Sequence, residues 1–227
     1  MSNSQFYTKD FYSTYQSGTK SSAEVIVPIV MELVSPKSVV DIGCGTGEFL
    51  KVFEDHGVKD ILGIDGDYAK KSLAIPIEQF IASDLEKPLS LDRTFDLAIS
   101  LEVAEHLSPE SANTFINSLT NLAPIVLFSA AIPGQGGTNH INEQWLTYWI
   151  KLFDHHDYTP VDAIRRRIWQ NKQVEPWYRQ NSVIFCEDGI LKTNRILAYE
   201  AKLTSPELLP IVHPEVFAYY VKPQKSG

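Results

Sequence analysis

A glycine-rich turn between an apolar run and a helix start constrains this chain more than any other segment. Residues 39–50 read VVDIGCGTGEFL, with three alternating glycines in the turn. Glycines let the backbone turn sharply and approach a ligand closely. The G-x-G-x-G spacing differs from the nicotinamide pattern G-x-G-x-x-G and from the phosphate loop G-x-x-x-x-G-K-[ST]. The segment therefore predicts an α/β protein with a ligand site where a strand meets a helix, and Asp41 favours a positively charged ligand.

The 227 residues are enough for one α/β domain with a substantial core. We expect one domain over 1–227, with an N-terminal flap over 1–20, a core over 20–187 and a C-terminal tail over 188–227. No apolar run reaches the ~18 residues that span a bilayer, and the net charge of −8 argues against phosphate contacts with a nucleic acid. The two cysteines suit a reducing compartment. We therefore expect a cytoplasmic monomer or homodimer with no nucleic-acid or membrane partner.

Helical and extended patterns alternate along the chain at the spacing of a doubly wound parallel sheet. A first helix is expected over 21–34, with Ser21 or Ser22 as its cap. Five strands are expected over 39–42, 61–65, 76–82, 94–101 and 124–131. Further helices are expected over 47–56, 109–122 and 142–155, and a final antiparallel pair of strands over 161–168 and 182–187.

Two of these segments resemble class I S-adenosylmethionine (SAM)-dependent methyltransferases. Residues 39–50 are similar to motif I of that family, and FDLAISLEVAEHL at 95–107 resembles its ubiquinone-type O-methyltransferase branch. The resemblance implies a Rossmann-like α/β fold with a seven-stranded, mostly parallel sheet and helices on both faces. It also implies SAM as the cofactor and S-adenosylhomocysteine as the product.

Acidic residues at successive strand ends carry the cofactor assignment. In the family, the residue matching Asp41 faces the amino group of SAM. Asp65 suits the ribose because a carboxylate accepts two hydroxyl hydrogen bonds, although a helix cap is the alternative. Asp84 matches the adenine position, with a turn aspartate as the alternative. The expected cofactor residues are Asp41, Gly43, Cys44, Gly45, Gly47, Asp65, Gly66, Ser83, Asp84, Leu85, Leu101 and Glu102.

An E-x-x-E-H pattern follows the fourth expected strand. Glu102, Glu105 and His106 are three and four residues apart, so they share one face of a helical turn. Related RNA 2′-O-methyltransferases and some ubiquinone-pathway enzymes place such a trio and a later histidine, here His140, around a divalent metal. Carboxylates and imidazoles suit Mg²⁺, Mn²⁺ or Zn²⁺. The alternative is that these residues only pack and hydrogen-bond.

His140 is also the best candidate for a general base, with His106 as the second catalytic candidate. It follows a glycine-rich stretch after the fifth strand, at the edge where ligands of such sheets bind. An imidazole ordinarily titrates near neutral pH and can take up a proton there. A purely structural or helix-capping histidine is the alternative.

Aromatic and amide side chains gather after the fifth strand and again near residues 177–181. Such a mixture suits a polar, ring-bearing acceptor such as a sugar or a hydroxylated natural product. The block also resembles bacterial methyltransferases that accompany glycosyltransferases or secondary-metabolite enzymes. The expected acceptor residues are Tyr15, Gln135, Asn139, Trp145 and Trp149. We therefore expect O-methylation of a small molecule. Methylation of nitrogen or a carboxylate, a non-catalytic SAM-binding protein and tryptophans in the core remain open alternatives.

Overall fold

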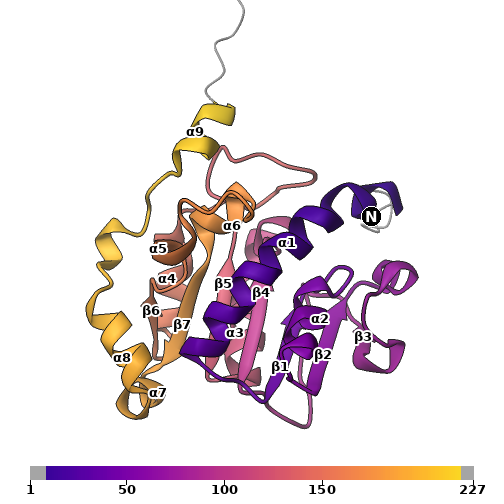
Figure 1. The fold of residues 1–227 in the computed structure, drawn as a ribbon, viewed down its shortest axis with the longest axis horizontal. Coiled ribbons are helices and arrows are strands. Elements are labelled where there is room, and N and C mark those ends of the chain that lie inside the picture. Colours follow the sequence, from indigo (N-terminus) through magenta and orange to yellow (C-terminus); the bar gives the residue numbers. More distant parts are fainter. Residues whose placement is uncertain (1–8, 221–227) are drawn as a thin grey trace, which may run out of the picture.

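The computed structural model describes residues 9–220, together with the side chains of residues 17–218. Seven strands form one sheet in the order β3-β2-β1-β4-β5-β7-β6, and helices cover both of its faces (Figure 1). The first five strands pair in parallel, whereas β7 runs antiparallel to both β5 and β6. The expected Rossmann-like fold with a mostly parallel seven-stranded sheet is confirmed.

The strands are short and largely buried, as expected for a sheet that is covered on both faces. Their bounds are β1 Ser38–Ile42, β2 Asp60–Asp65, β3 Phe80–Ala82, β4 Leu97–Leu101, β5 Ile125–Ser129, β6 Tyr158–Val161 and β7 Val183–Glu187. The carboxyl ends of the parallel strands meet at one edge of the sheet, and this edge positions the site described below.

Two apolar layers hold the helices against the sheet. On one face pack α1 Lys9–Leu33 and α2 Glu48–Asp55, together with α5 Arg165–Ile168. On the other face lie α3 Ala112–Leu122 and α4 Leu146–Asp154. Each helix presents an apolar stripe to the sheet, which is the usual reason that a surface helix stays docked.

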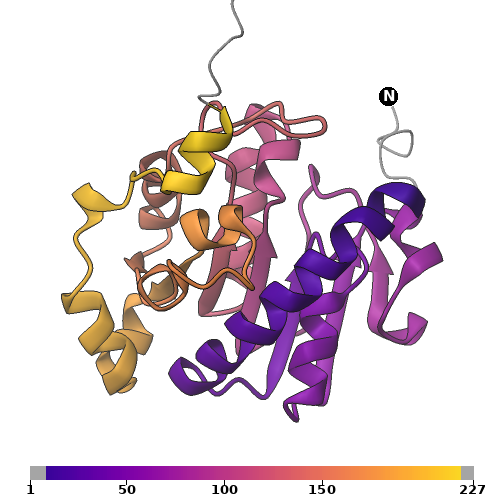
Figure 2. The same cartoon turned by 45° about the horizontal axis from the view of Figure 1, so that its top comes forward.

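The C-terminal part wraps the end of the sheet that carries β6 and β7 (Figure 2). It contains three helices, α7 Asp188–Thr193, α8 Arg195–Lys202 and α9 Pro214–Tyr220, and it follows α6 Pro176–Asn181. Short 3-10 turns link the other elements: η2 Asp67–Ser72, η3 Ile77–Gln79, η4 Ala104–His106, η5 Pro109–Ser111 and η6 Pro206–Leu208.

Two sequence expectations at the N-terminal side need correction. The first helix does not begin at Ser21 or Ser22, because α1 already runs from Lys9. Both serine hydroxyls donate back to the carbonyl of Gly18 instead of capping the helix, at 3.1 and 2.7 Å. Residues 9–20 of the expected flap therefore belong to α1, and residues 1–8 lie outside the described part.

Later boundaries also differ from expectation. Residues 161–168 are not a strand: β6 ends at Val161, and Arg165 turns back in a helix to pair with Asp162 at 2.9 Å. This i,i+3 ion pair fits helical rather than extended backbone. The third strand begins at Phe80 because η3 occupies the residues after Pro76, and α4 begins at Leu146 rather than at residue 142.

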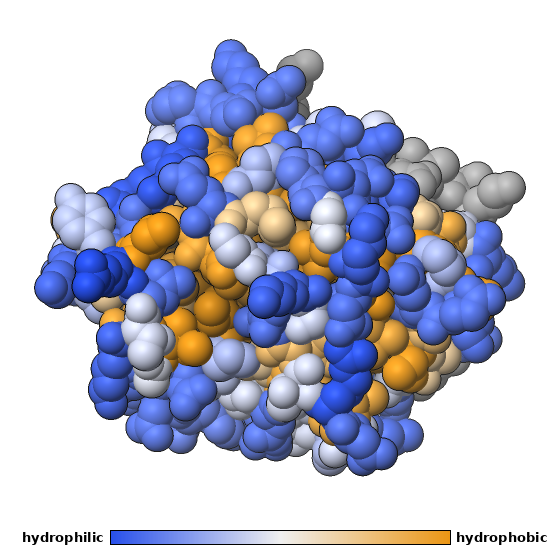
Figure 3. Space-filling model, turned by 60° about the horizontal axis from the view of Figure 1, so that its bottom comes forward, coloured by the Kyte–Doolittle hydropathy of each residue, from blue (hydrophilic) through white to orange (hydrophobic). Residues whose placement is uncertain are grey.

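None of the helices in the described range is both long and apolar enough to cross a membrane. The face that comes forward in Figure 3 is largely hydrophilic, with apolar side chains in patches between the charged ones. Some of the exposed apolar side chains belong to α8, namely Ile196, Tyr199 and Leu203.

Candidate active site

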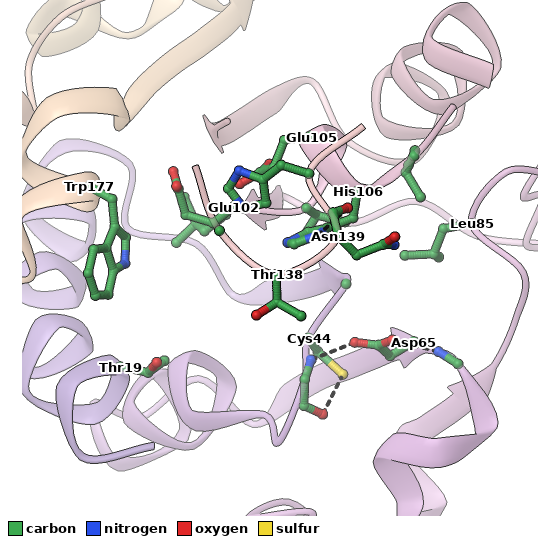
Figure 4. Close-up of a pocket in the computed structure, with 18 of the residues that line it drawn as sticks. Thr19, Cys44, Asp65, Leu85, Glu102, Glu105, His106, Thr138, Asn139 and Trp177 are labelled. Atoms are coloured by element: carbon green, nitrogen blue, oxygen red, sulfur yellow. Dashed lines mark hydrogen bonds between the residues drawn. The ribbon is translucent and has the colours of Figure 1, made fainter. Parts of the chain in front are cut away.

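A cavity of about 1720 Å³ opens at the carboxyl edge of the parallel strands. Its walls come from the loops after β1, β2 and β4, from the glycine-rich segment after β5, and from α1, α6 and α9. In Figure 4, Cys44 and Asp65 lie on one side of it and Glu102, Glu105 and His106 on another, with Thr19 and Trp177 toward the helices. Ligands of open α/β sheets bind at this edge.

The glycine turn is held tightly between two neighbouring loops. Gly43 has φ of 87°, and a Cβ there would lie 2.4 Å from a methyl of Val103. The Gly43 N–H donates to the carbonyl of Ile64 at 2.7 Å, and Gly45 N–H donates to Asp65 Oδ2 at 2.7 Å. The left-handed backbone and the close contact together explain why glycine is needed at position 43.

Asp65 and Asp41 are two buried carboxylates at the ends of neighbouring strands. Asp65 Oδ1 accepts from Gly66 N–H at 2.6 Å and from the Tyr68 hydroxyl at 2.7 Å. Burial raises the pKa of Asp65, while these bonds and that of Gly45 oppose the rise. Burial and then the nearby Asp65 raise the pKa of Asp41 well above its usual range. A cationic ligand beside both groups would relieve the cost of their burial.

Most of the expected cofactor residues line the cavity: Asp41, Gly43, Cys44, Gly45, Asp65, Gly66, Ser83, Asp84, Leu85, Leu101 and Glu102. Gly47 instead caps α2 with φ of 81°, and a Cβ there would lie 3.1 Å from Ile75. Asp84 is exposed at the rim, where it pairs with Lys87 at 3.1 Å and accepts from Glu86 N–H at 3.2 Å. The turn role weighed for Asp84 is therefore present alongside its place in the wall.

Glu102 is fixed by two amide side chains. Gln135 Nε2 donates to one carboxylate oxygen at 2.9 Å, and Asn181 Nδ2 donates to the other at 3.1 Å. Its φ is 56°, a left-handed conformation that costs a non-glycine residue about 1–3 kcal/mol. Burial raises the pKa of Glu102, while hydrogen bonds from Ser129, Asn181 and Gln135 oppose the rise.

Glu105 differs from Glu102 because neither of its carboxylate oxygens makes a hydrogen bond of ordinary geometry with a described residue. Its side chain is fully buried, and its backbone carbonyl anchors the later loop by accepting from the N–H groups of Ile141 and Asn142 at 2.9 and 3.0 Å. Burial and then the neighbouring Glu102 raise its pKa well above the usual range. A buried carboxylate without donors is costly unless a cation or a proton accompanies it.

His106 and His140 complete a cluster with Glu105. One ligand atom from each of the three residues lies within 4.8 Å of the others, and the two rings meet edge to face with centroids 4.8 Å apart. Burial and then His140 lower the pKa of His106 to about 4. Its ring is therefore neutral at neutral pH, which is the form that binds metals.

The cluster fits a divalent cation, since it offers a carboxylate without donors and two imidazoles. It brings together three of the four residues expected around a metal. Glu102 is the exception, because Gln135 and Asn181 already occupy both of its oxygens.

The acceptor residues divide between the cavity and the core. Gln135 and Asn139 line the cavity. Trp149 does not reach it, because it is 1% exposed and packs on Phe128 with ring centroids 5.4 Å apart. Trp145 lies just before α4, 40% exposed, and is not among the residues of the wall. Tyr15 lies in α1, and its side chain is outside the described part.

Several wall residues come from segments that the sequence analysis did not assign to the site: Thr19, Tyr68, Lys71, Glu215 and Val216. No local motif surrounds Thr19 or Glu215, so only their tertiary positions identify them. The aromatic and amide residues near 177–181 had a compositional signal, and Trp177, Tyr178 and Asn181 do reach this region.

Comparison with known proteins identifies a related domain over most of the chain. A family model described as a methyltransferase domain matches residues 21–171. Among curated proteins, no sequence matches this chain.

Several solved structures share the fold. A putative O-methyltransferase from Nostoc punctiforme is 14% identical, with 81% of this chain and 59% of that chain covered and a TM-score of 0.56. The methyltransferase domain of a bacterial Hen1 protein is 21% identical, with 73% and 97% covered and a TM-score of 0.53. Streptomyces venezuelae DesVI is 18% identical, with 60% and 61% covered and a TM-score of 0.48. The chain thus spans about three-fifths of the Nostoc and Streptomyces proteins.

Proposed function

Because this chain belongs to the methyltransferase-domain family, we propose that it is a SAM-dependent methyltransferase acting on a hydroxyl group of a small molecule. The observation that carries the choice of a hydroxyl is the cluster of Glu105, His106 and His140 beside Glu102 in the cavity. A hydroxyl is a weak nucleophile and gains most from a nearby base or cation.

The cofactor would lie along the ends of β1, β2 and β4. Asp41 would face its ammonium group, Asp65 its ribose hydroxyls, and Asp84 and Leu85 its adenine. The positions of these residues in one cavity wall support that order. The sulfonium would then lie near Leu101 and Glu102, between the cofactor turn and the histidines.

Methyl transfer would be a direct in-line displacement. The acceptor oxygen attacks the methyl carbon, the bond from that carbon to sulfur breaks, and S-adenosylhomocysteine leaves. The hydroxyl proton passes to His140. Removal of water from the sulfonium favours a transition state in which its charge disperses, and alignment of the two reactants supplies much of the rate.

A divalent cation at Glu105, His106 and His140 is part of the proposal. When bound, it would hold the acceptor oxygen and favour its deprotonated form. The undonated carboxylate of Glu105 and the neutral ring of His106 support this assignment.

The acceptor is proposed to be a ring-bearing molecule without phosphate, such as a sugar or a hydroxylated natural product. Acidic side chains dominate the charged part of the wall: Asp41, Asp65, Asp67, Asp84, Glu86, Glu102, Glu105 and Glu215, against the single lysine Lys71. Such a wall repels phosphate groups, whereas Trp177 and Pro176 offer apolar surfaces to a ring.

The same acidic wall favours a second candidate function, N-methylation of an amine. Carboxylates would attract an ammonium group, and an amine needs less help than a hydroxyl to become a nucleophile. Replacement of His140 by alanine separates the two. Turnover of a hydroxyl acceptor should fall at least tenfold, whereas turnover of an amine acceptor should change little.

The first experiment is a calorimetric titration of the protein with SAM, in chelator and then with added Mg²⁺, Mn²⁺ or Zn²⁺. We expect SAM to bind in all conditions, because Asp41 and Asp65 do not belong to the cation cluster. Absence of SAM binding in every condition contradicts the proposed function. Panels of hydroxylated sugars, phenols and matched amines then follow, with Glu105→Gln as the variant that removes the cation. Full turnover by that variant in chelator contradicts the cation.

A further inference from the structure

Glu143 lies three residues after His140, and its carboxylate gathers three N–H groups of one loop. Oε1 accepts from Gly136 N–H at 2.6 Å and from His140 Nδ1 at 2.9 Å, while Oε2 accepts from Gly134 N–H at 2.8 Å. The side chain is 19% exposed, so part of its surface is shielded from water. No role of Glu143 follows from the methyl-transfer scheme above.

These contacts hold the loop that carries His140 in one shape. Gly134 and Gly136 have φ of 83° and 66°, and Asn139 has φ of 59°, so the loop contains several left-handed residues. The imidazole lies against the backbone of Gly137, where a Cβ would come within 2.3 Å of His140 Nε2. Glu143 joins the start of this loop to the histidine at its end, and thereby fixes the place of the ring.

The same contact determines which ring nitrogen carries the hydrogen. A carboxylate only accepts hydrogen bonds, so His140 Nδ1 must donate. In a neutral imidazole, the other nitrogen then carries the lone pair. Nε2 is therefore the atom of His140 that is left to take a proton or to bind a cation in the cluster with Glu105 and His106.

We propose that Glu143 is a positioning residue for the methyl-transfer reaction, because it sets the orientation and the tautomer of His140. It contacts the histidine rather than the reacting atoms. A carboxylate on the far nitrogen of a histidine has this effect in metal sites and in hydrolase triads. The inference rests on the proposed function of His140, but its structural content can be tested separately.

The test begins with the tautomer, which does not require an acceptor. In chelator, at a pH where the ring is neutral, long-range ¹H–¹⁵N NMR should show His140 predominantly protonated at Nδ1, with His140→Gln to assign the signal. Glu143→Leu, which removes every acceptor, should shift the ring toward protonation at Nε2. Glu143→Gln retains a carbonyl oxygen and should largely restore the Nδ1–H form. Protonation at Nε2 in the unaltered protein overturns the proposal.

Cation affinity gives the second readout. Titration with Zn²⁺ alone should show affinity weakened about 10- to 100-fold in Glu143→Leu, the usual effect of losing such a partner. The matched control is Glu110→Gln, an exposed acid of η5, which should leave Zn²⁺ affinity and tautomer unchanged. SAM affinity within twofold in all variants shows that the cofactor half remains folded. An unchanged tautomer together with unchanged Zn²⁺ affinity in Glu143→Leu overturns the proposal.

The outcomes also separate this proposal from the proposed function. If the tautomer responds to Glu143 but His140→Ala retains full methyl transfer to a hydroxyl acceptor, the positioning stands and the assigned role of His140 fails. If His140 is required but its tautomer ignores Glu143, the assigned role stands and the positioning fails.

Discussion

At the scale of single residues, Gly43 shows how little room the cofactor turn leaves. We predict that Gly43→Ala will destabilise the protein more than Gly57→Ala. Both glycines are left-handed, which costs an alanine about 1–2 kcal/mol, but a Cβ at Gly57 meets nothing within 4 Å while one at Gly43 meets Val103. Chemical denaturation of both variants measures the difference, and calorimetry should show weaker SAM binding only for Gly43→Ala. Equal losses for the two variants would show that the contact with Val103 is unimportant.

Asp65 carries the second prediction at this scale. Asp65→Asn should weaken SAM binding more than tenfold, about 1.4 kcal/mol, because an amide accepts fewer hydrogen bonds than a carboxylate. Tyr68→Phe is the control, since it removes one partner of Asp65 and leaves the carboxylate in place. It should change SAM affinity less than Asp65→Asn does. Near-normal binding by Asp65→Asn would remove Asp65 from the ribose site.

The sequence predicts some site residues well because their positions follow from strand ends. Asp41 and Asp65 close neighbouring parallel strands, so the topology alone brings them to one edge. Trp149 was placed wrongly because a tryptophan suits both a core and a pocket, and the start of α4 decides which way it points. Glu143 has no motif of its own, since its partners depend on the path of a glycine-rich loop.

At the scale of elements, α8 depends on a cap that also joins it to α1. Asn194 Oδ1 accepts from the N–H groups of Ile196 and Leu197, both at 3.0 Å, and Nδ2 donates to the carbonyl of Leu33 at 3.2 Å. We predict that Asn194→Ala will lose about 1 kcal/mol of unfolding free energy, the typical value of such a cap. Asn194→Asp keeps the cap and loses only the donor to Leu33.

Denaturant unfolding of both Asn194 variants measures these losses. Asn194→Asp should fall between the alanine variant and the unaltered protein, and its deficit reports the link to α1. A stability of Asn194→Ala equal to that of the unaltered protein would contradict the capping role.

The sequence predicts elements best where a turn signal fixes a boundary. The helix after the glycine turn was expected over 47–56 and is α2, because Gly47 and Gly57 mark its two ends. The segment 161–168 was taken for a strand because its apolar residues suit either structure, and only the pairing of Arg165 with Asp162 reveals a helix. Pairing of β7 between β5 and β6 depends on distant residues and has no local signal.

At the scale of the whole molecule, one ion pair attaches the C-terminal part to the cavity wall. Arg179 of α6, with a side chain only 3% exposed, donates to both carboxylate oxygens of Glu215 in α9, at 3.2 and 2.7 Å. Glu215 and Val216 also line the cavity. The C-terminal helix is thus part of the candidate site rather than an appendage to it.

The pair makes attachment of α9 depend on pH. Arg179 lowers the pKa of Glu215, so the carboxylate stabilises the docked tail above the ordinary glutamate pKa, and this contribution is lost as the pH falls through the lowered value. Glu215→Gln should therefore increase hydrogen exchange of residues 209–220 at neutral pH, and the difference should vanish at acidic pH. Glu207→Gln, an exposed acid of η6, is the control. A difference that persists at low pH would contradict the ion pair as its cause.

The place of β7 in the sheet has a consequence for biosynthesis. Residues of β5 and β6 leave the ribosome before β7, yet in the described sheet β6 pairs only with β7. The strand nearest the end of the sheet must therefore wait for residues 183–187 before it gains a neighbour. Asn181, which holds Glu102, emerges immediately before that strand. A nascent chain consequently completes its glycine turn early, and its reaction centre is assembled only when the last strand inserts.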